Sequence, residues 1–314
     1  GKAGEAPFGR TEVVAMSRET SAGAGKPYGL ERVCRVLEFP RSTIYAQAQR
    51  QAAKVVPLHP ARRGPKPKVS DADLLGAIRA DLAASPFTGE GHRKVWARLR
   101  ILRDIRVGRG RVLRLMRENH LLSPHRRPQG APILHDGTIT TDRPNAMWGT
   151  DGIRIETVDE GWVWVFSAVD HFDACCVGIH AVKIGNRFAA LQPIAQGLKG
   201  EFGATGADAG RGLALRMDNG TQYTADDFLN QVKFWGIAPS FAFVAEPQTN
   251  GVAERFNRTL KEQAIHGRVF RNVEEVRAAV TAFRDRYNHH WRLEKLGFMS
   301  PLEARQTYAS RKAA

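Results

Sequence analysis

Apolar side chains recur at helical spacing near the start of the chain. Leu30, Val33, Leu37 and Ile44 predict two short helices on either side of a turn at 38–41. Two such helices are typical of a helix-turn-helix, whose second helix enters a DNA groove, and equally of a plain helical hairpin. The Gly-, Ala- and Ser-rich segment 1–28 that precedes them has a composition that predicts flexibility.

A second helical group follows a cationic, proline-rich stretch at 57–69, which cannot be helical. Ser70 and Asp73 form a capping-box-like helix start, with Asp in place of the usual Glu. Three apolar segments then predict three helices, separated by the glycine-containing turns at 89–91 and around Gly108. These segments are Leu74–Leu82, Val95–Leu99 and Val112–Met116.

Beyond residue 144 the pattern changes to β-type alternation and then alternates strands with helices. The predicted strands are 148–158, 162–166, 175–179, 213–217 and 237–244, and the predicted helices are 187–198, 225–235 and 252–265. Such an order predicts an α/β domain in which a mixed sheet is covered by helices on both faces.

These patterns divide the chain into consecutive parts. We expect a flexible N-terminus (1–28), a helix-turn-helix-like segment (29–56), a basic linker (57–69), a second helical domain (70–128), a linker (129–143), an α/β core (144–270) and a C-terminal helical tail (271–314).

Composition narrows the class of protein. With 314 residues, 42% hydrophobic and 25% charged, the chain is long enough for two or three domains with buried cores. Its longest apolar stretch, Trp162–Val169, is far shorter than a membrane-spanning helix, and no secretory signal is visible. The three cysteines, Cys34, Cys175 and Cys176, fit a reducing compartment. We therefore expect a cytoplasmic protein that does not enter membranes.

The net charge of +15 is concentrated in one block, because residues 41–130 hold 20 Lys and Arg against six Asp and Glu. Such a block favours nucleic acid as the partner over an anionic membrane or an acidic protein. Arg109, Arg111 and Arg114 recur on one predicted helix without an obvious acidic counterweight, which favours phosphate contact over a merely solvated face. Arg62 and Arg63 in the basic linker are further candidates for DNA contact.

Three acidic residues follow or end predicted elements: Asp151, Asp218 and Glu254, separated by 66 and 35 residues. Singly, each has a structural explanation: the end of a strand, an Asp-Asn-Gly turn, and an anion near a helix N-terminus. Together, three carboxylates are suitable ligands for Mg²⁺ or Mn²⁺. Two such ions stabilise the entering and leaving oxygens of an in-line phosphoryl displacement.

The motifs around these acids resemble a known family. Trp148-Gly-Thr-Asp151, Met217-Asp-Asn-Gly-Thr-Gln-Tyr223 and the run Asn250-Gly-Val-Ala-Glu-Arg-Phe-Asn-Arg-Thr-Leu-Lys261 are similar to the integrase-type core of bacterial insertion-sequence transposases of the orfB type. The acidic spacing is that of the aspartate–aspartate–thirty-five–glutamate (DDE) superfamily. Upstream residues 89–99 and 109–119 resemble the helix-turn-helix region that precedes such cores, and residues 287–288 and 296–303 extend the resemblance downstream.

The resemblance implies an RNase H-like fold in which Asp151, Asp218 and Glu254 bind two Mg²⁺ or Mn²⁺ ions. It implies that Lys261 contacts DNA near the cut, and Asn219 and Gln248 are weaker candidates for positioning DNA. Arg93 and Lys94, in the upstream motif, are expected to contact DNA as well. Asp170, Asp173 and Glu262 are interpreted as structural or exposed acids. No zinc is expected, because Cys34 is the only cysteine of the N-terminal half.

The resemblance therefore implies a DNA transposase that acts on double-stranded DNA, namely the terminal inverted repeats of its element and a target. It would be bacterial, nucleoid-associated, and a homo-oligomer on DNA, since two element ends must be held at once. Two alternatives stay open at this point: a catalytically silent DNA-binding regulator with an integrase-like scaffold, and a nuclease that cannot join strands. No serine or tyrosine stands in a nucleophile motif that would form a covalent intermediate.

Overall fold

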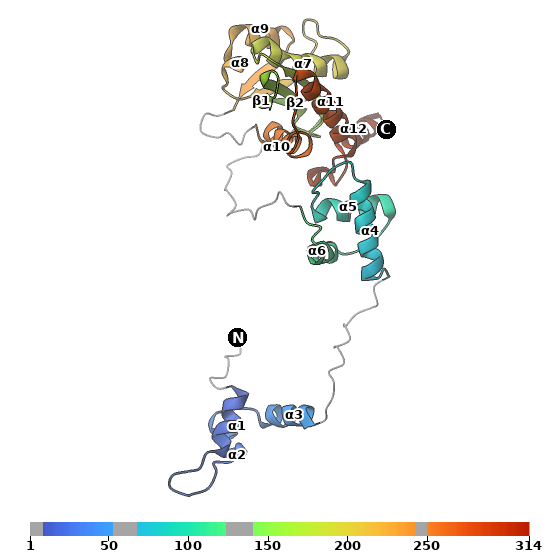
Figure 1. The fold of residues 1–314 in the computed structure, drawn as a ribbon. Coiled ribbons are helices and arrows are strands. Elements are labelled where there is room, and N and C mark those ends of the chain that lie inside the picture. The colour runs from blue at the N-terminus through green and yellow to red at the C-terminus, as the bar shows by residue number, and fades with distance from the viewer. Residues whose placement is uncertain (1–8, 53–67, 124–140, 243–249, 314) are drawn as a thin grey trace. The chain divides into compact units, whose positions relative to one another are not determined.

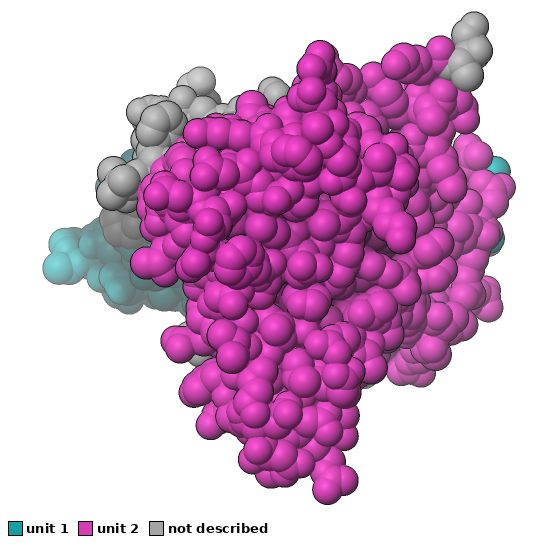
Figure 2. All heavy atoms as spheres, turned by 90° about the horizontal axis from the view of Figure 1, so that it is seen from above, with its two compact units in different colours: residues 1–68 teal, residues 69–314 magenta. Residues whose placement is uncertain are grey.

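The computed structural model describes residues 9–52, 68–123, 141–242 and 250–313. The chain divides into two compact units, 1–68 and 69–314, which Figure 2 distinguishes by colour. Within the described ranges, none of the helices combines the length and the apolar character that crossing a membrane requires.

Unit 1 contains the two helices that the apolar spacing predicts, and one more. The additional helix α1 shows that the expectation of a flexible segment over 1–28 is wrong from residue 10 onward. The Gly9 N–H donates to the Glu12 carboxylate at 2.8 Å, which caps the helix. Val13 is fully buried against the other two helices, so packing holds α1 in place. The three helices are α1 (Arg10–Arg18), α2 (Leu30–Val36) and α3 (Arg41–Ala52).

Unit 2 opens with the three helices predicted after Ser70. The Ser70 hydroxyl accepts the Asp73 N–H at 3.1 Å, which confirms the predicted helix start. The apolar faces of the three helices enclose Leu74, Val95 and Met116, all fully buried. The helices are α4 (Asp71–Ala84), α5 (His92–Arg103) and α6 (Arg109–Glu118).

The predicted α/β core is built on a mixed five-stranded sheet of order β3-β2-β1-β4-β5. β1 pairs antiparallel with β2, and β2 with β3, whereas β4 and β5 run parallel to β1. The predicted α/β class and all five predicted strands are confirmed. The strands are β1 (Met147–Thr157), β2 (Gly161–Asp170), β3 (Cys176–Val182), β4 (Ala214–Met217) and β5 (Ala238–Phe241).

Helices cover both faces of this sheet, as the alternating pattern predicts (Figure 1). One hydrophobic cluster joins α7 and α9 to one face, around Trp148 and Phe166. A second cluster joins α10 and α11 to the other face, around Val163 and Phe256. The helices are α7 (Arg187–Phe202), α8 (Thr221–Thr224), α9 (Asp226–Phe234), α10 (Gly251–Leu260) and α11 (Val273–His290), with a π-helical turn at Lys261–Ile265.

The segment expected as a C-terminal tail is integrated into the core. Val280 and Phe283 of α11 are fully buried in the same cluster as the strands. The last helix, α12 (Pro301–Ala313), is fixed by Arg305. The α11 part of the expected tail is thus a component of the catalytic-core fold.

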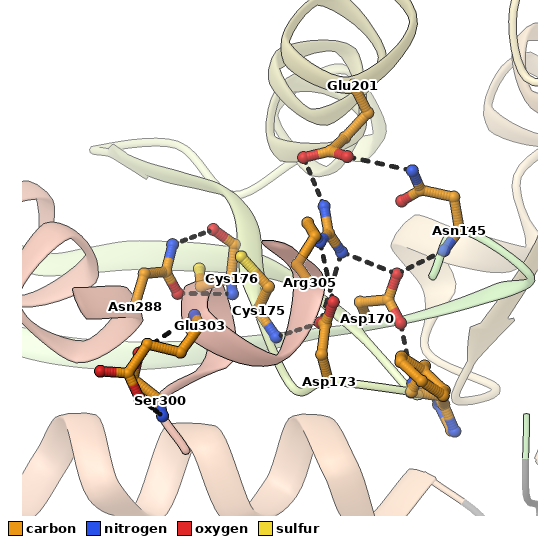
Figure 3. Close-up of polar contacts among 12 residues, drawn as sticks. Asn145, Asp170, Asp173, Cys175, Cys176, Glu201, Asn288, Ser300, Glu303 and Arg305 are labelled. Atoms are coloured by element: carbon orange, nitrogen blue, oxygen red, sulfur yellow. Dashed lines mark hydrogen bonds and ion pairs between the residues drawn. The ribbon is translucent and has the colours of Figure 1, made fainter. Parts of the chain in front are cut away.

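Arg305 is held by three carboxylates, from the β2–β3 turn and from α7 (Figure 3). It contacts Asp170 at 2.9 Å, Asp173 at 2.8 Å and also Glu201. Asp170 and Asp173 are completely buried, and Asp170 also accepts the Asn145 N–H at 2.7 Å. The interpretation of Asp170 and Asp173 as structural acids is confirmed.

Candidate active site

Asp151 lies in the middle of β1 rather than at a strand end, which corrects the sequence expectation. β1 pairs with β2 from Trp148 to Thr157, so the strand continues well past Asp151. The Asp151 carboxylate accepts two hydrogen bonds, from the Asn257 amide at 2.9 Å and from the Gly152 N–H at 2.7 Å. Even so, burial raises the pKa of Asp151 above its ordinary value.

Asn257 of α10 is a site residue that sequence reasoning missed. Its amide donates to Asp151, and its side-chain oxygen accepts the Ser167 hydroxyl at 3.2 Å. Asn257 is 4% exposed and Ser167 is fully buried. Ser167 lies opposite Asp151 on β2, so the two strands and the helix meet at one polar contact. The sequence signal that could have identified Asn257 is its spacing of three residues from Glu254, which places the two side chains on one face of the helix.

A glycine in β1 allows α10 to approach this strand closely. A Cβ on Gly149 would lie 2.8 Å from the Asn250 side-chain oxygen, closer than van der Waals contact permits. Because Gly149 has no Cβ, the Asn250 side chain fits beside β1. Its buried amide donates to the Thr150 carbonyl at 3.0 Å and attaches the start of α10 to β1. This contact brings the first turn of α10, with Glu254, next to Asp151.

Asp151 and Glu254 line one cavity of about 320 Å³, and Lys261 lines it as well. Glu254 is solvent-exposed, and its pKa is raised by partial burial and then by the negative charge of Asp151. The positive charge of Lys261 acts in the opposite direction on Asp151. The described lining comprises Asp151, Ile153, Glu254, Asn257, Arg258, Lys261, Glu262 and His266. Glu262, interpreted from the sequence as structural or exposed, is thus part of the cavity wall.

Asp218 follows β4, which is the parallel neighbour of β1. Its carboxylate accepts the Gly220 N–H at 3.0 Å in the expected turn, and its charge contributes to the raised pKa of Asp151. Asn219 donates to the Ala242 carbonyl at 3.1 Å, which fixes the turn to the strand beside it. Asp218 is therefore within electrostatic range of Asp151, outside the described wall of the cavity.

The three acids do not form a preassembled metal site. In the part of the chain that the structure describes, no three His, Cys, Asp or Glu side chains lie close enough together to hold one metal ion. Besides burial, the negative charge of Asp218 raises the pKa of Asp151, and the charge of Asp151 in turn raises the pKa of Glu254. Asp151 and Glu254 line the same cavity, and Asp218 follows the strand that pairs with β1. Metal binding by these acids stays a prediction.

The cations predicted to contact DNA have acidic partners that the sequence pattern did not reveal. Asp71 contacts Arg111 at 2.6 Å and Arg114 at 2.5 Å, and Glu118 contacts Arg114 at 2.9 Å. The premise that this helix lacks an acidic counterweight is therefore wrong, because Asp71 is contributed by α4, forty residues earlier.

The other predicted DNA contacts are distributed differently. Arg93 and Arg109 both reach Glu294, whereas Lys94 contacts Glu90 and the ring of Trp291. Arg62, Arg63 and Gln248 lie outside the described residues. DNA contact by these residues stays a prediction.

Comparisons with known proteins agree with the fold. Profiles described as "Integrase core domain" match residues 141–247 and 235–301, and one described as "HTH-like domain" matches residues 72–129. The transposase for insertion sequence element IS629 of Shigella sonnei is 27% identical over 292 residues, covering 90% of this chain and 93% of that protein. The transposase InsD for insertion element IS2 of Escherichia coli is 27% identical over 243 residues, covering 74% and 78%.

Among solved structures, the catalytic core domain of BIV integrase is 22% identical, with a TM-score of 0.39 over 54% of this chain and 99% of that one. The chain thus contains an HTH-like domain followed by integrase core domain matches, and the core is an RNase H-like α/β fold. This domain order and the similarity to insertion-sequence transposases are consistent with a transposase of the orfB type.

Proposed function

We propose that this protein is a DNA transposase that hydrolyses phosphodiesters at the ends of an insertion sequence and then joins the freed 3′ ends to target DNA. The observation that supports the proposal is that Asp151 and Glu254 line one cavity with Lys261, while Asp218 follows β4, the strand paired in parallel with β1. These four residues come from β1, the end of β4, α10 and the π-helical turn, and the family motifs place them in this order along the chain.

The donor chemistry of the site fits divalent metal ions. Asp151, Asp218 and Glu254 offer hard carboxylate oxygens, the ligands that Mg²⁺ and Mn²⁺ prefer. The raised pKa of Asp151 and that of Glu254 reflect burial and mutual repulsion, both of which a cation would relieve. Two bound ions would supply an activated water or hydroxyl and charge neutralisation at the leaving 3′ oxygen.

The residues of the chain then have separate roles. Asn257 holds one oxygen of Asp151 in a fixed direction through its amide, and Ser167 keeps the Asn257 amide from flipping. Lys261 presents a flexible cation on the same cavity wall, suited to a DNA phosphate beside the cut. The HTH-like domain and the helices of unit 1 are expected to bind the terminal repeats, and two chains are expected to hold two element ends.

The test is incubation of the full-length chain with labelled element ends in Mg²⁺ and, separately, in EDTA, with cleaved and joined products scored on a gel. We expect both products only with the metal. Asp151→Asn, Asp218→Asn and Glu254→Gln should each lower both rates by at least about 10³-fold while end binding persists. DNA binding without metal-dependent cleavage would instead identify a silent regulator, and cleavage without joining would identify a nuclease.

A further inference from the structure

The segment 291–298, between α11 and α12, forms much of the contact between the HTH-like domain and the catalytic core. The ring of Trp291 meets the edge of Phe87 at 4.8 Å between centroids, and Phe298 meets Trp96 at 5.8 Å. Lys295 donates to the His171 carbonyl at 3.0 Å and so fixes the segment to the core. The sequence motif 296–303, which the catalytic site does not use, is therefore partly an interdomain contact.

The carboxylate of Glu294 in this segment is shared by two arginines of the HTH-like domain. Its Oε2 lies 2.7 Å from the Arg93 guanidinium, and its Oε1 lies 3.9 Å from the Arg109 guanidinium. Arg93 belongs to the first turn of α5 and Arg109 to the first turn of α6. Two helices thus direct one cation each to a single acidic group.

These two arginines and their acidic partner are about half exposed. The side chains of Arg93 and Arg109 are 53% and 52% exposed, and that of Glu294 is 50% exposed. By contrast, Arg98 is 9% exposed and held by Asp81 and Glu90. Ion pairs between exposed groups contribute little free energy, so an external anion can replace Glu294 without a large penalty.

We propose that Arg93 and Arg109 form one phosphodiester-binding site, and that Glu294 occupies this site as a phosphate mimic in the DNA-free protein. A DNA phosphodiester carries one negative charge on two non-bridging oxygens, as a carboxylate does, so it matches the same pair of guanidinium groups. DNA and Glu294 then compete for the two arginines. The inference rests on the proposed function only in taking DNA as the partner.

The competition predicts that DNA binding loosens the contact at 291–298. On its other side, the segment 291–298 is attached to the core. Lys295, next to Glu294, donates hydrogen bonds to two backbone carbonyls of the β2–β3 turn. The reciprocal hydrogen bonds between Thr88 and Gln263, at 3.0 and 2.8 Å, join the same two domains beside Lys261. Release of Glu294 by DNA would leave the Thr88–Gln263 hydrogen bonds as a link between the two domains.

The test measures the anisotropy of a fluorescein-labelled mixed-sequence DNA duplex with the full-length chain in EDTA, so that no catalysis occurs. We expect Glu294→Gln to bind this duplex about 3- to 10-fold more tightly, because the competing charge is gone. The matched control is Glu274→Gln, which removes one exposed, ion-paired carboxylate on α11 and changes the net charge equally. This control should change affinity by less than about twofold.

The double variant Arg93→Gln/Arg109→Gln should bind more weakly, with a salt dependence reduced by about two released counterions. Adding Glu294→Gln to that double variant should change nothing further. The proposal is overturned if Glu294→Gln binds the duplex with the same affinity as Glu274→Gln. It is also overturned if Glu294→Gln increases the affinity equally in the variant that lacks the two arginines. Since binding is measured without metal, a loss of catalytic activity in the cleavage assay would not affect this result, and each proposal can fail alone.

Discussion

Replacement of Asn257 by Ala removes the hydrogen bond that orients Asp151. A hydrogen bond to a charged group contributes about 1.5–3 kcal/mol, and Ser167 would also lose its buried acceptor. Loss of a group that orients a metal ligand typically lowers metal affinity or activity by about 10- to 100-fold. We therefore expect Asn257→Ala to bind Mn²⁺ about 10- to 100-fold more weakly, measured by titration calorimetry on the full-length chain, with a parallel loss of cleavage.

The control is Asn272→Ala, which removes the side chain that accepts the Glu275 N–H at the start of α11. It should lower stability by about 1 kcal/mol without changing Mn²⁺ affinity. Asn257→Ala should also raise the pKa of Asp151 further, because the hydrogen bond that Asn257 donates favours the ionised carboxylate. As the pH is lowered, the cleavage rate of the variant should therefore begin to fall at a higher pH than that of the parent chain. Unchanged Mn²⁺ affinity, together with a stability loss equal to that of the control, would refute the orienting role.

Two further predictions concern the buried Arg305 cluster. Arg305→Ala leaves the buried carboxylates Asp170 and Asp173 unpaired and should destabilise the fold by about 3–5 kcal/mol in urea denaturation; a loss below about 1 kcal/mol would contradict this. Burial, followed by the charge of Asp173, raises the pKa of Asp170 to about 6, so the folded state keeps a proton that the unfolded state loses near pH 4. The contribution of Asp170 to stability is thus lost as the pH rises from about 4 through 6. Asp170→Asn should remove this pH dependence from thermal melting curves. An unchanged pH profile would show that Asp170 does not titrate in this range.

The sequence predicts the elements of this fold well, because each is encoded by local periodicity. Strands β1 to β5 and helices α4 to α7 follow from alternation and helical spacing within ten or so residues. The spacing of 66 and 35 residues between the three acids identifies the family through its motifs. Helix α1 escaped this reasoning because glycine and alanine around it suggested flexibility, while its stability comes from the burial of Val13 against α2 and α3.

Most of the contacts that the sequence pattern did not reveal join segments far apart along the chain. Asp71 and Arg111 are 40 residues apart, and Asn257 and Asp151 are 106 residues apart. Arg93 and Glu294 are separated by 201 residues. Helical and strand periodicity reports which face of an element is buried, but the partner of a polar group on that face is set by tertiary packing. A cationic run read from the sequence alone therefore overstates the number of arginines that are available to DNA.

The distribution of opposite charges separates structural acids from those of the candidate site. Asp170 and Asp173 share the buried Arg305, and Asp81 shares Arg98 with Glu90. Among the described residues, by contrast, no cation forms an ion pair with Asp151, Asp218 or Glu254. Asp151 instead receives an amide and a backbone N–H, two neutral donors that orient a carboxylate without cancelling its charge. The fold thus pairs its structural acids with buried arginines, whereas at these three acids Lys261 acts to lower the pKa of Asp151 without forming an ion pair, and bound divalent cations would neutralise the remaining negative charge.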